Sequence, residues 1–278
     1  MQGRLLPPVG GRIQSFPVLR WRDEFAHARD AGIDGIEWIY EAGTDAQNPL
    51  STDAGLAEIR HLADSYGVFV RSVCADYFMT DTLVDDTGRP RSKSIERLRW
   101  LIDRAGAASL RYMVLPFVDA SSAARLPTLD ALRAILRAAL TLAETFVLEL
   151  HLETDLAPMD LAALLSEVGH PLLRANLDIG NSASLGHEAD SEMRAIGPWL
   201  GSVHVKDRVL GGATVALGKG DADFATYFSH LATLGYSGTY ILQVARGSPG
   251  EEVELARRNR AFVESAMMRS SGRSPERA

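Results

Sequence analysis

The sequence predicts an α/β fold, a single (β/α)8 TIM barrel. Helical and strand-like patterns alternate from one end of the 278-residue chain to the other, which favours a parallel α/β architecture. A barrel of about 250 residues also accounts for nearly all of this length. No linker with a shift in composition divides the chain, so we expect one barrel over residues 1–268 and a disordered tail over residues 269–278.

Eight strands are predicted from short runs rich in apolar residues. Pro116 is expected to end the fourth strand, because proline cannot donate a backbone hydrogen bond to a neighbour. The predicted strands cover residues 1–5, 35–41, 68–74, 112–115, 147–152, 173–177, 202–205 and 239–244.

Eight helices are predicted between and after these strands. Thr52 or Asp53 can cap the second helix, and Gly32 ends the first because glycine adopts the left-handed conformation readily. Ser248 and Pro249 mark the start of the last helix. The other predicted helices cover residues 21–31, 93–107, 129–145, 159–168, a weaker segment closed by Pro198 and Trp199, and 222–234; a glycine-rich loop over residues 211–220 follows the seventh strand.

Four apolar runs in the second half of the chain end on polar residues able to bind a metal. Glu153, Asp178, His204 and Gln243 are separated by 25, 26 and 39 residues, about one strand-plus-helix unit each, with the last interval widened by a loop. The carboxyl ends of neighbouring strands meet at one mouth of a parallel barrel, so we expect a shared site. Two carboxylates and an imidazole suit a divalent metal, with Gln243 as a neutral ligand that cannot act as a base.

Each of these residues also has a structural interpretation. Glu153 alone could be a solvated loop acid, Asp178 could form an Asx turn, and His204 could be a hydrogen-bonded core residue. Strand alternation puts Glu149, His151 and Glu153 on one face. A charge inside a barrel is costly unless it is paired, so we expect Glu149 near an end of its strand and Glu153 as the ligand.

The segment that follows His204 is dense in polar residues. We expect His204 on the metal, with Lys206, Asp207 or Arg208 reaching the ligand or orienting the histidine. Phosphate sites of TIM barrels often use the seventh and eighth loops. Those loops offer Lys206, Arg208, Lys219, Arg246 and the helix start at Ser248, although Lys219 and Arg246 could equally be solvated charges.

Composition excludes several classes of protein. A formal charge of −7 and a pI near 5.5 argue against nucleic acid as the main partner. A single cysteine, Cys74, rules out an internal disulfide and a thiolate zinc site. We find no secretory signal and no apolar run of about 18 residues, so we expect a cytoplasmic protein without a membrane segment. The sequence leaves open whether it forms a homo-oligomer.

Taken together, five motifs resemble the xylose-isomerase-like barrel superfamily, in its sugar and sugar-phosphate isomerase/epimerase branch. The resemblance covers about residues 1–268 and implies that Glu153, Asp178 and His204 are metal ligands. It also implies that Glu37 lies at the barrel mouth and that Arg208 contacts substrate. We place Asn181, Lys206, Asp207 and Arg246 with Glu37 and Arg208 as candidate substrate-binding residues. The motifs are Gly35-Ile36-Glu37, the strand-end Glu153, Asp178-Ile179-Gly180-Asn181, His204-Val205-Lys206-Asp207-Arg208 and Leu217-Gly218-Lys219-Gly220-Asp221.

The resemblance implies a sugar or sugar-phosphate isomerase or epimerase that uses one divalent ion, Mn, Mg, Co or Zn, and acts through an enediolate. In this family two opposed glutamates hold the metal and move a proton at the carbon beside the carbonyl. Gln243 stands where the second is expected. A two-base epimerisation would need a substitute such as Asp76, Asp207 or water, whereas a one-base isomerisation would not. Our hypothesis from sequence is a single base, Glu153.

Three other functions are weighed against this one. A related metal-dependent lyase or dehydratase would use the same enolate, and a non-catalytic sugar-binding barrel would explain the missing acid at Gln243. Apurinic-site endonucleases share the superfamily, but they need many histidine ligands. Here the third strand ends in Cys74-Ala75-Asp76, which together with the acidic pI argues against nuclease action.

Overall fold

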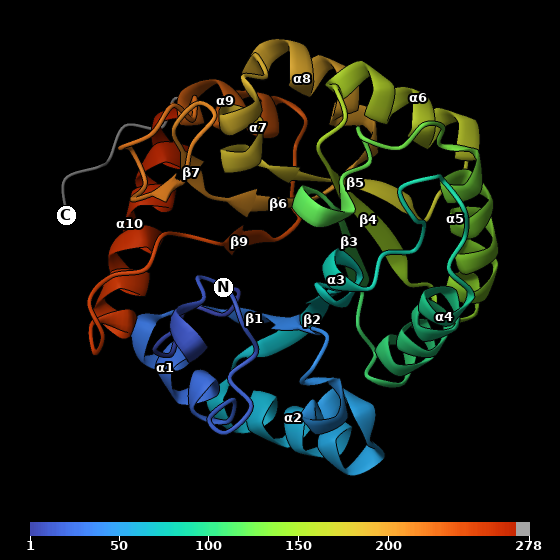
Figure 1. Ribbon diagram of the computed structural model, residues 1–278. Coiled ribbons are helices and arrows are strands. Elements are labelled where there is room, and N and C mark those ends of the chain that lie inside the picture. The colour runs from blue at the N-terminus through green and yellow to red at the C-terminus, as the bar shows by residue number, and fades with distance from the viewer. Residues whose placement is uncertain (271–278) are drawn as a thin grey trace.

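Parallel strands surrounded by a ring of helices form the centre of the molecule (Figure 1). The computed structural model describes residues 1–270. Within them, seven strands form one sheet in the order β1-β2-β3-β4-β5-β6-β9, all paired in parallel, which confirms the predicted barrel. The strands are β1 (Gly35–Ile39), β2 (Phe69–Cys74), β3 (Tyr112–Phe117), β4 (Glu149–Thr154), β5 (Leu173–Asp178), β6 (Leu200–Val205) and β9 (Tyr240–Leu242), and a separate hairpin pairs β7 (Asp207–Arg208) with β8 (Thr214–Val215).

An irregular segment at residues 1–3 bridges β9 and β1, where the first strand, over residues 1–5, was expected. The backbone N–H of Gln2 donates to the Leu242 carbonyl at 3.2 Å, and that of Glu37 donates to the Met1 carbonyl at 3.0 Å. Gly3 then takes a left-handed conformation with φ of 57°, which turns the chain out of the sheet. The predicted strand over residues 1–5 is therefore wrong, although the segment occupies the expected place.

A second correction concerns Pro116. The third barrel strand, β3, runs through Pro116 to Phe117 instead of ending before it. Pairing between β2 and β3 stops at Cys74 and Val114, so Pro116 pairs with β4 alone. At such a position the missing N–H leaves no ladder bond unmade, and proline is tolerated.

The helices follow the predicted alternation, with two short additions. Helices α3 and α7 come directly after β2 and β5 and lie at the carboxyl ends of the strands (Figure 1). As predicted, Thr52 caps α2 by accepting from the Gly55 N–H at 3.0 Å, and Gly32 ends α1 in the left-handed conformation. The helices are α1 (Asp23–Ala31), α2 (Asp53–Tyr66), α3 (Tyr77–Thr80), α4 (Ser92–Ala107), α5 (Asp130–Ala143), α6 (Pro158–Val168), α7 (Ile179–Leu185), α8 (Ala189–Ile196), α9 (Phe224–Thr233) and α10 (Glu252–Ser270).

The predicted C-terminal boundary of the barrel domain, residue 268, falls inside the last helix, α10. Helix α10 continues through Arg269 and Ser270, past the predicted limit at residue 268. The rest of the predicted tail, residues 271–278, lies outside the described residues. Among residues 1–270, no helix is both long and apolar enough to cross a membrane.

Apolar side chains fill the space between the barrel and its helices. Helix α5 shows why the sequence folds this way, because its buried residues recur at helical spacing and face the sheet. An aromatic group around Trp38 joins the loop before α1 to strand β1, with Phe16 and Trp21 at ring-centroid distances of 5.6 and 5.5 Å. This packing fixes the strands whose carboxyl ends carry the candidate site. The buried residues of α5 are Leu132, Ile135, Leu136, Ala139, Leu140 and Ala143.

Candidate metal centre and active site

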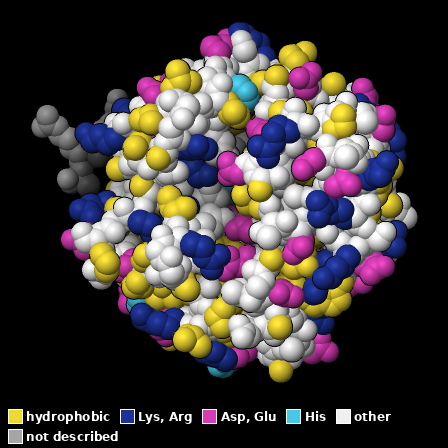
Figure 2. Space-filling model, in the orientation of Figure 1, with side chains coloured by type: hydrophobic (Ala, Val, Ile, Leu, Met, Phe, Trp, Pro, Cys, Tyr) yellow, Lys and Arg dark blue, Asp and Glu magenta, His cyan; other side chains and the backbone are white. Residues whose placement is uncertain are grey.

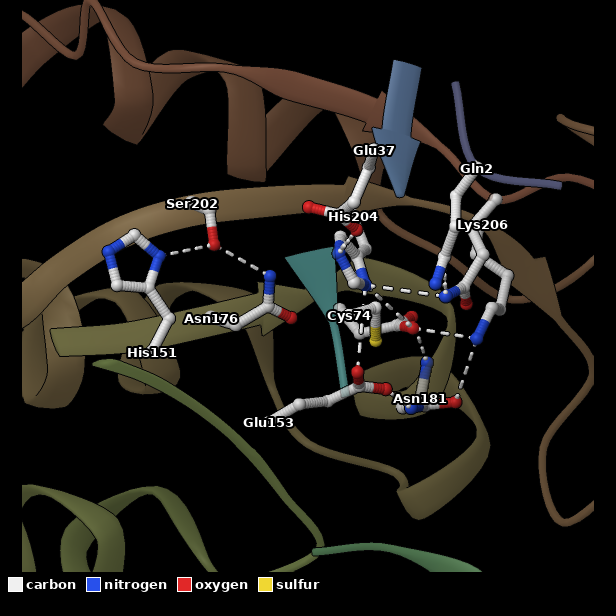
Figure 3. A network of polar contacts seen from close by, with 12 residues as sticks. Gln2, Glu37, Cys74, His151, Glu153, Asn176, Asn181, Ser202, His204 and Lys206 are labelled. Carbon is white, nitrogen blue, oxygen red and sulfur yellow. Dashed lines mark hydrogen bonds and ion pairs between the residues drawn. The ribbon is translucent and has the colours of Figure 1, made fainter. Parts of the chain in front are cut away.

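Glu153, Asp178 and His204 come together toward the carboxyl ends of three adjacent strands, β4, β5 and β6. Figure 3 shows Glu153 and His204 in this group. Asp178 and His204 are direct partners in the parallel register. One possible ligand atom from each of the three residues lies within 4.8 Å of the other two, and all three side chains are buried. The structure thus brings together three of the four residues predicted to share a metal.

His204 is held so that one ring nitrogen faces the two carboxylates. Its Nε2 lies 2.8 Å from Glu37 Oε1, and Ser72 Oγ donates to the other Glu37 oxygen at 2.8 Å. Its Nδ1 lies 3.6 Å from Glu153 Oε2 and 4.0 Å from Asp178 Oδ2. A proton on Nε2 donated to Glu37 leaves the Nδ1 lone pair directed at the carboxylates, as in carboxylate–histidine–metal arrangements.

The charges around His204 favour ionised groups despite burial. Burial alone would lower the pKa of His204, but Glu37, Glu153 and Asp178 outweigh it and raise that pKa. Burial likewise opposes ionisation of Glu37, but His204 and the Ser72 hydrogen bond hold the Glu37 pKa below its ordinary value. These charges favour a second proton on the ring, at Nδ1, and a cation bound there would take the place of that proton while Nε2 still donates to Glu37.

The two carboxylates of the cluster have opposite pKa shifts. Burial, together with the neighbouring Asp178, raises the pKa of Glu153 to about 7. Burial acts against ionised Asp178 as well, but Lys206 and His204 overcome it and lower the Asp178 pKa. Lys206 Nζ lies 2.7 Å from Asp178 Oδ2, and Asn181 Nδ2 donates to Glu153 Oε1 at 2.7 Å. The surroundings thus favour the carboxylate form of Asp178 and, relative to an exposed glutamate, the protonated form of Glu153.

Gln243 borders this cluster through its amide. The Nε2 atom of Gln243 donates to Gln2 Oε1 at 2.5 Å and lies 3.5 Å from His204 Nδ1. An amide nitrogen is a donor and not a ligand, so ligation requires the oxygen to face His204. Among the described residues, buried Gln2 Nε2 has no hydrogen-bond partner. Turning both amides would let Gln2 Nε2 donate to Gln243 Oε1 and would present that oxygen to the cluster.

A cavity of about 500 Å³ opens over the cluster and is lined by Glu153 and Gln243. Three of the predicted substrate-binding residues line it, namely Asn181, Lys206 and Arg208. Figure 2 shows acidic and basic side chains side by side near the middle of this face. The other lining residues are Arg4, Arg12, Ile13, Gln14, Glu41, Ala42, Asp76, Met79, Thr80, Pro116, Val118, Asp119, Ala213 and Thr214.

The other three predicted substrate contacts, Glu37, Asp207 and Arg246, are engaged within the protein. Both carboxylate oxygens of buried Glu37 are bound by His204 and Ser72. Buried Asp207 accepts from the backbone N–H groups of the glycine-rich loop, and Arg246 donates to backbone carbonyls of the N-terminal loop. In the structure these three side chains bind the protein itself and do not line the cavity, and their role as substrate contacts stays a prediction.

Sequence reasoning missed Arg4 and Gln14, which the N-terminal loop brings to the cavity. Arg4 is buried and donates to the Val244 carbonyl at 3.1 Å and to Gln14 Oε1 at 2.7 Å. Burial lowers the Arg4 pKa to about 9. The available signal was an arginine directly before the apolar pair Leu5 and Leu6, where a buried charge needs a structural or functional reason.

The chain belongs to the family described as "Xylose isomerase-like TIM barrel", whose model matches residues 25–266. A search of curated proteins finds L-ribulose-5-phosphate 3-epimerase UlaE of Escherichia coli (strain K12), which is 24% identical over 263 residues. That alignment covers 90% of this chain and 92% of the relative.

Solved structures show the same fold. An L-ribulose 3-epimerase superposes with a TM-score of 0.72 at 17% identity, covering 100% of this chain and 98% of that one. A xylose isomerase-like TIM barrel protein from Mycobacterium smegmatis, solved in complex with magnesium, gives a TM-score of 0.68 at 20% identity and covers 96% of this chain and 94% of that one. At these identities the structural likeness shows the fold, and the function has to be argued from the site.

Proposed function

We propose that this protein is a divalent-metal-dependent epimerase or isomerase of a ketose sugar or sugar phosphate. The observation that carries the proposal is the buried group of Glu153, Asp178 and His204 beside a polar cavity that Glu153 lines. The names of the relatives, which are sugar 3-epimerases, support the same class of reaction.

The donor set fits a hard or borderline divalent cation. Glu153, Asp178 and His204 Nδ1 would hold it, and Gln243 Oε1 could complete the set. Lys206 is in direct contact with Asp178, and a cation between the three side chains would also compensate Glu153, which supports this assignment. When bound, the ion would polarise the substrate carbonyl and stabilise the negative charge that develops on its oxygen.

Glu153 is the base in the proposed reaction. Its carboxylate removes the proton from the carbon beside the substrate carbonyl, the C–H electron pair becomes the C=C bond of the enediolate, and the carbonyl π pair moves to oxygen. Asn181 fixes the orientation of Glu153 through the 2.7 Å hydrogen bond. Lys206 keeps Asp178 ionised, so that the proton goes to Glu153 and not to its neighbour.

Arg208 supports an anionic or hydroxyl-rich substrate. Its Nη1 donates to Asn181 Oδ1 at 2.9 Å and its Nε donates to the Gly212 carbonyl at 3.0 Å, so the guanidinium is held in place at the cavity wall. Among the described residues, no carboxylate forms an ion pair with Arg208. Its positive charge is therefore available to a phosphate or a sugar hydroxyl.

Exchange of hydrogen at the substrate carbon tests this function. Protein loaded with Mn²⁺ is incubated in deuterated water with a panel of ketoses and their phosphates that includes L-ribulose and L-ribulose 5-phosphate, and the carbon beside the carbonyl is followed by NMR. Deuterium incorporation with formation of an epimer or aldose is the expected result. Loss of water or of a carbon fragment would identify a lyase instead, and tight sugar binding without exchange would identify a binding protein.

A further inference from the structure

An epimerisation needs a second proton transfer, and no residue has yet been assigned to it, because Gln243 cannot supply or accept a proton as a carboxylate does. Four carboxylates line the cavity among the described residues: Glu41, Asp76, Asp119 and Glu153. Glu41 is bound by both terminal nitrogens of Arg12, at 2.8 and 3.2 Å. Asp119 is an exposed residue at the start of the short 3-10 helix Asp119–Ser121. Asp76 is the carboxylate that remains besides Glu153.

Asp76 differs from the other acids of the cavity in its surroundings. It lies between β2 and α3 and is partly exposed. Gln14 Nε2 donates to its Oδ2 at 2.5 Å and Cys74 Sγ donates to its Oδ1 at 3.1 Å. Both donors are neutral, and within residues 1–270 no lysine, arginine or histidine forms an ion pair with Asp76. It is thus a fixed carboxylate without a counter-charge in direct contact, which suits a group that gains and loses a proton.

Gln14 fixes the position of Asp76 relative to the cavity wall. The Gln14 oxygen accepts from Arg4 Nη1 at 2.7 Å, and Arg4 is itself bound to the Val244 carbonyl just after Gln243. Asp76 follows β2, whereas Glu153 lies within β4, and β3 separates these two strands, so the two residues reach the cavity from different strands. The other substitute considered from sequence, Asp207, does not line the cavity and accepts four loop N–H groups.

We propose that Asp76 is the second proton-transfer residue, which works with Glu153 and makes this protein an epimerase. This inference rests on the proposed function and replaces the single-base scheme. Glu153 removes a proton from the carbon beside the carbonyl, the C–H pair forms the C=C bond, and the carbonyl pair moves to oxygen. Protonated Asp76 then gives its proton to the opposite face of that carbon, the C=C pair forms the new C–H bond, and the carbonyl forms again.

The cycle balances with one proton exchanged through solvent. Glu153 ends protonated and Asp76 ends ionised, so each returns to its starting form by exchange with water. Burial raises the pKa of Asp76, which favours the protonated form that the second step requires. The reverse reaction uses the same two residues in exchanged roles, as microscopic reversibility demands.

Asp76→Asn tests the proposal, with Asp81→Asn as the matched control. Asp76 precedes the short helix α3 and Asp81 follows it, and Asp81 does not line the cavity. Each Mn²⁺-loaded variant is incubated in deuterated water with the ketose or ketose phosphate that the wild type converts. We expect Asp76→Asn to form epimer about 100-fold more slowly or worse, while Glu153 still exchanges the hydrogen of the unconverted substrate within about threefold of the wild-type rate. Asp81→Asn should match the wild type in both.

Three results would overturn the inference. They are epimer formation by Asp76→Asn at the wild-type rate, equal loss of exchange and epimer formation, and a raised KM with kcat unchanged. If Asp76→Asn does not fold, the proposal is tested by the source of the hydrogen in the product that the wild type forms. Its product must carry solvent deuterium from the first turnover, whereas transfer of the substrate's own hydrogen into the product shows a single base. Failure of the proposed function is distinct, because the wild type would then exchange no sugar at all.

Discussion

Two buried histidines, His204 and His151, lie in similar local settings within the barrel and differ in what they can do (Figure 3). His151 Nε2 lies 2.9 Å from Glu149 Oε2, and its Nδ1 lies 2.8 Å from Ser202 Oγ. His204 Nε2 lies 2.8 Å from Glu37. Both rings are therefore oriented by a carboxylate. The second nitrogen of His151 is used by a hydroxyl, whereas that of His204 faces two further carboxylates.

The difference lies in the surrounding charge. The Glu149 side chain is 41% exposed at the start of β4, as its predicted place near a strand end required, whereas the Glu37 side chain is fully buried. Burial lowers the pKa of His151 despite Glu149, while three carboxylates raise the pKa of His204. A carboxylate–histidine pair is thus a common structural unit, and the acids on the other side of the ring decide whether it can hold a cation.

The largest expected effect is on turnover, and it should distinguish Glu153 from Glu149, which lie on the same face of β4. Glu153→Gln should reduce turnover by about 10²- to 10⁴-fold, because it removes the proposed base. Glu149→Gln removes a partly exposed acid outside the cavity and should leave turnover within about twofold. Steady-state rates on the same metal-loaded preparations check this. Full turnover by Glu153→Gln would remove the assignment of the base.

Replacing the two histidines should separate cation binding from stability. We expect His204→Gln to weaken Mn²⁺ binding by at least about 100-fold, because it removes a proposed ligand. His151→Gln should keep that affinity and lower the free energy of unfolding by about 1–3 kcal/mol, since Ser202 loses a buried partner. Calorimetric titration and urea unfolding measure the two effects. Equal loss of affinity in both variants would contradict the comparison.

A smaller effect is expected from the carboxylate behind His204. Glu37→Gln should reduce Mn²⁺ affinity by about 10- to 100-fold, as for other groups that orient a ligand without touching the metal. Ser72→Ala, which removes one neutral hydrogen bond to the same carboxylate, should have a lesser effect in the same direction. Unchanged affinity in Glu37→Gln would show that the contact does not orient the ligand.

Replacing Glu24, a buried residue of α1 that lies outside the cavity, tests how burial changes the pKa of a carboxylate and the stability of the fold. Burial raises its pKa to about 7 from 4.5, so the folded state holds this proton more tightly. Protonated Glu24 therefore contributes its full stabilisation of the folded state below pH 4.5, and this contribution is lost as the pH rises through about 7. Compared with wild type, Glu24→Gln should lose less stability between pH 5 and pH 8, by on the order of 2 kcal/mol. Urea unfolding at the two pH values measures it, and parallel losses would be the contrary result.

Local patterns were sufficient for most of the fold and for the centre of the site. Apolar runs located the seven barrel strands, and the rule that parallel strands present their carboxyl ends at one mouth brought Glu153, Asp178 and His204 together. The first strand failed because Gly3 ends the pairing of a segment that local hydrophobicity alone would extend.

Partners distant in the chain could not be predicted in the same way. Glu37 and His204 are separated by 167 residues, and Gln14 and Asp76 by 62. Arg246 bonds to carbonyls over 230 positions away in sequence. Nothing in the local sequence around these residues indicates which side chain or carbonyl will satisfy them, so their roles became visible only in the folded barrel.

The contact between Glu37 and His204 also bears on the order of folding. Because it joins β1 to β6, it closes a very long chain segment, and such contacts are expected to form after the local βα units have assembled. A partly folded chain with β4, β5 and β6 in place would already hold Glu153, Asp178 and His204 on adjacent strands. It would lack Glu37, the carboxylate that orients the His204 ring. We therefore expect the complete site to form only in the last step of folding, in which the barrel closes.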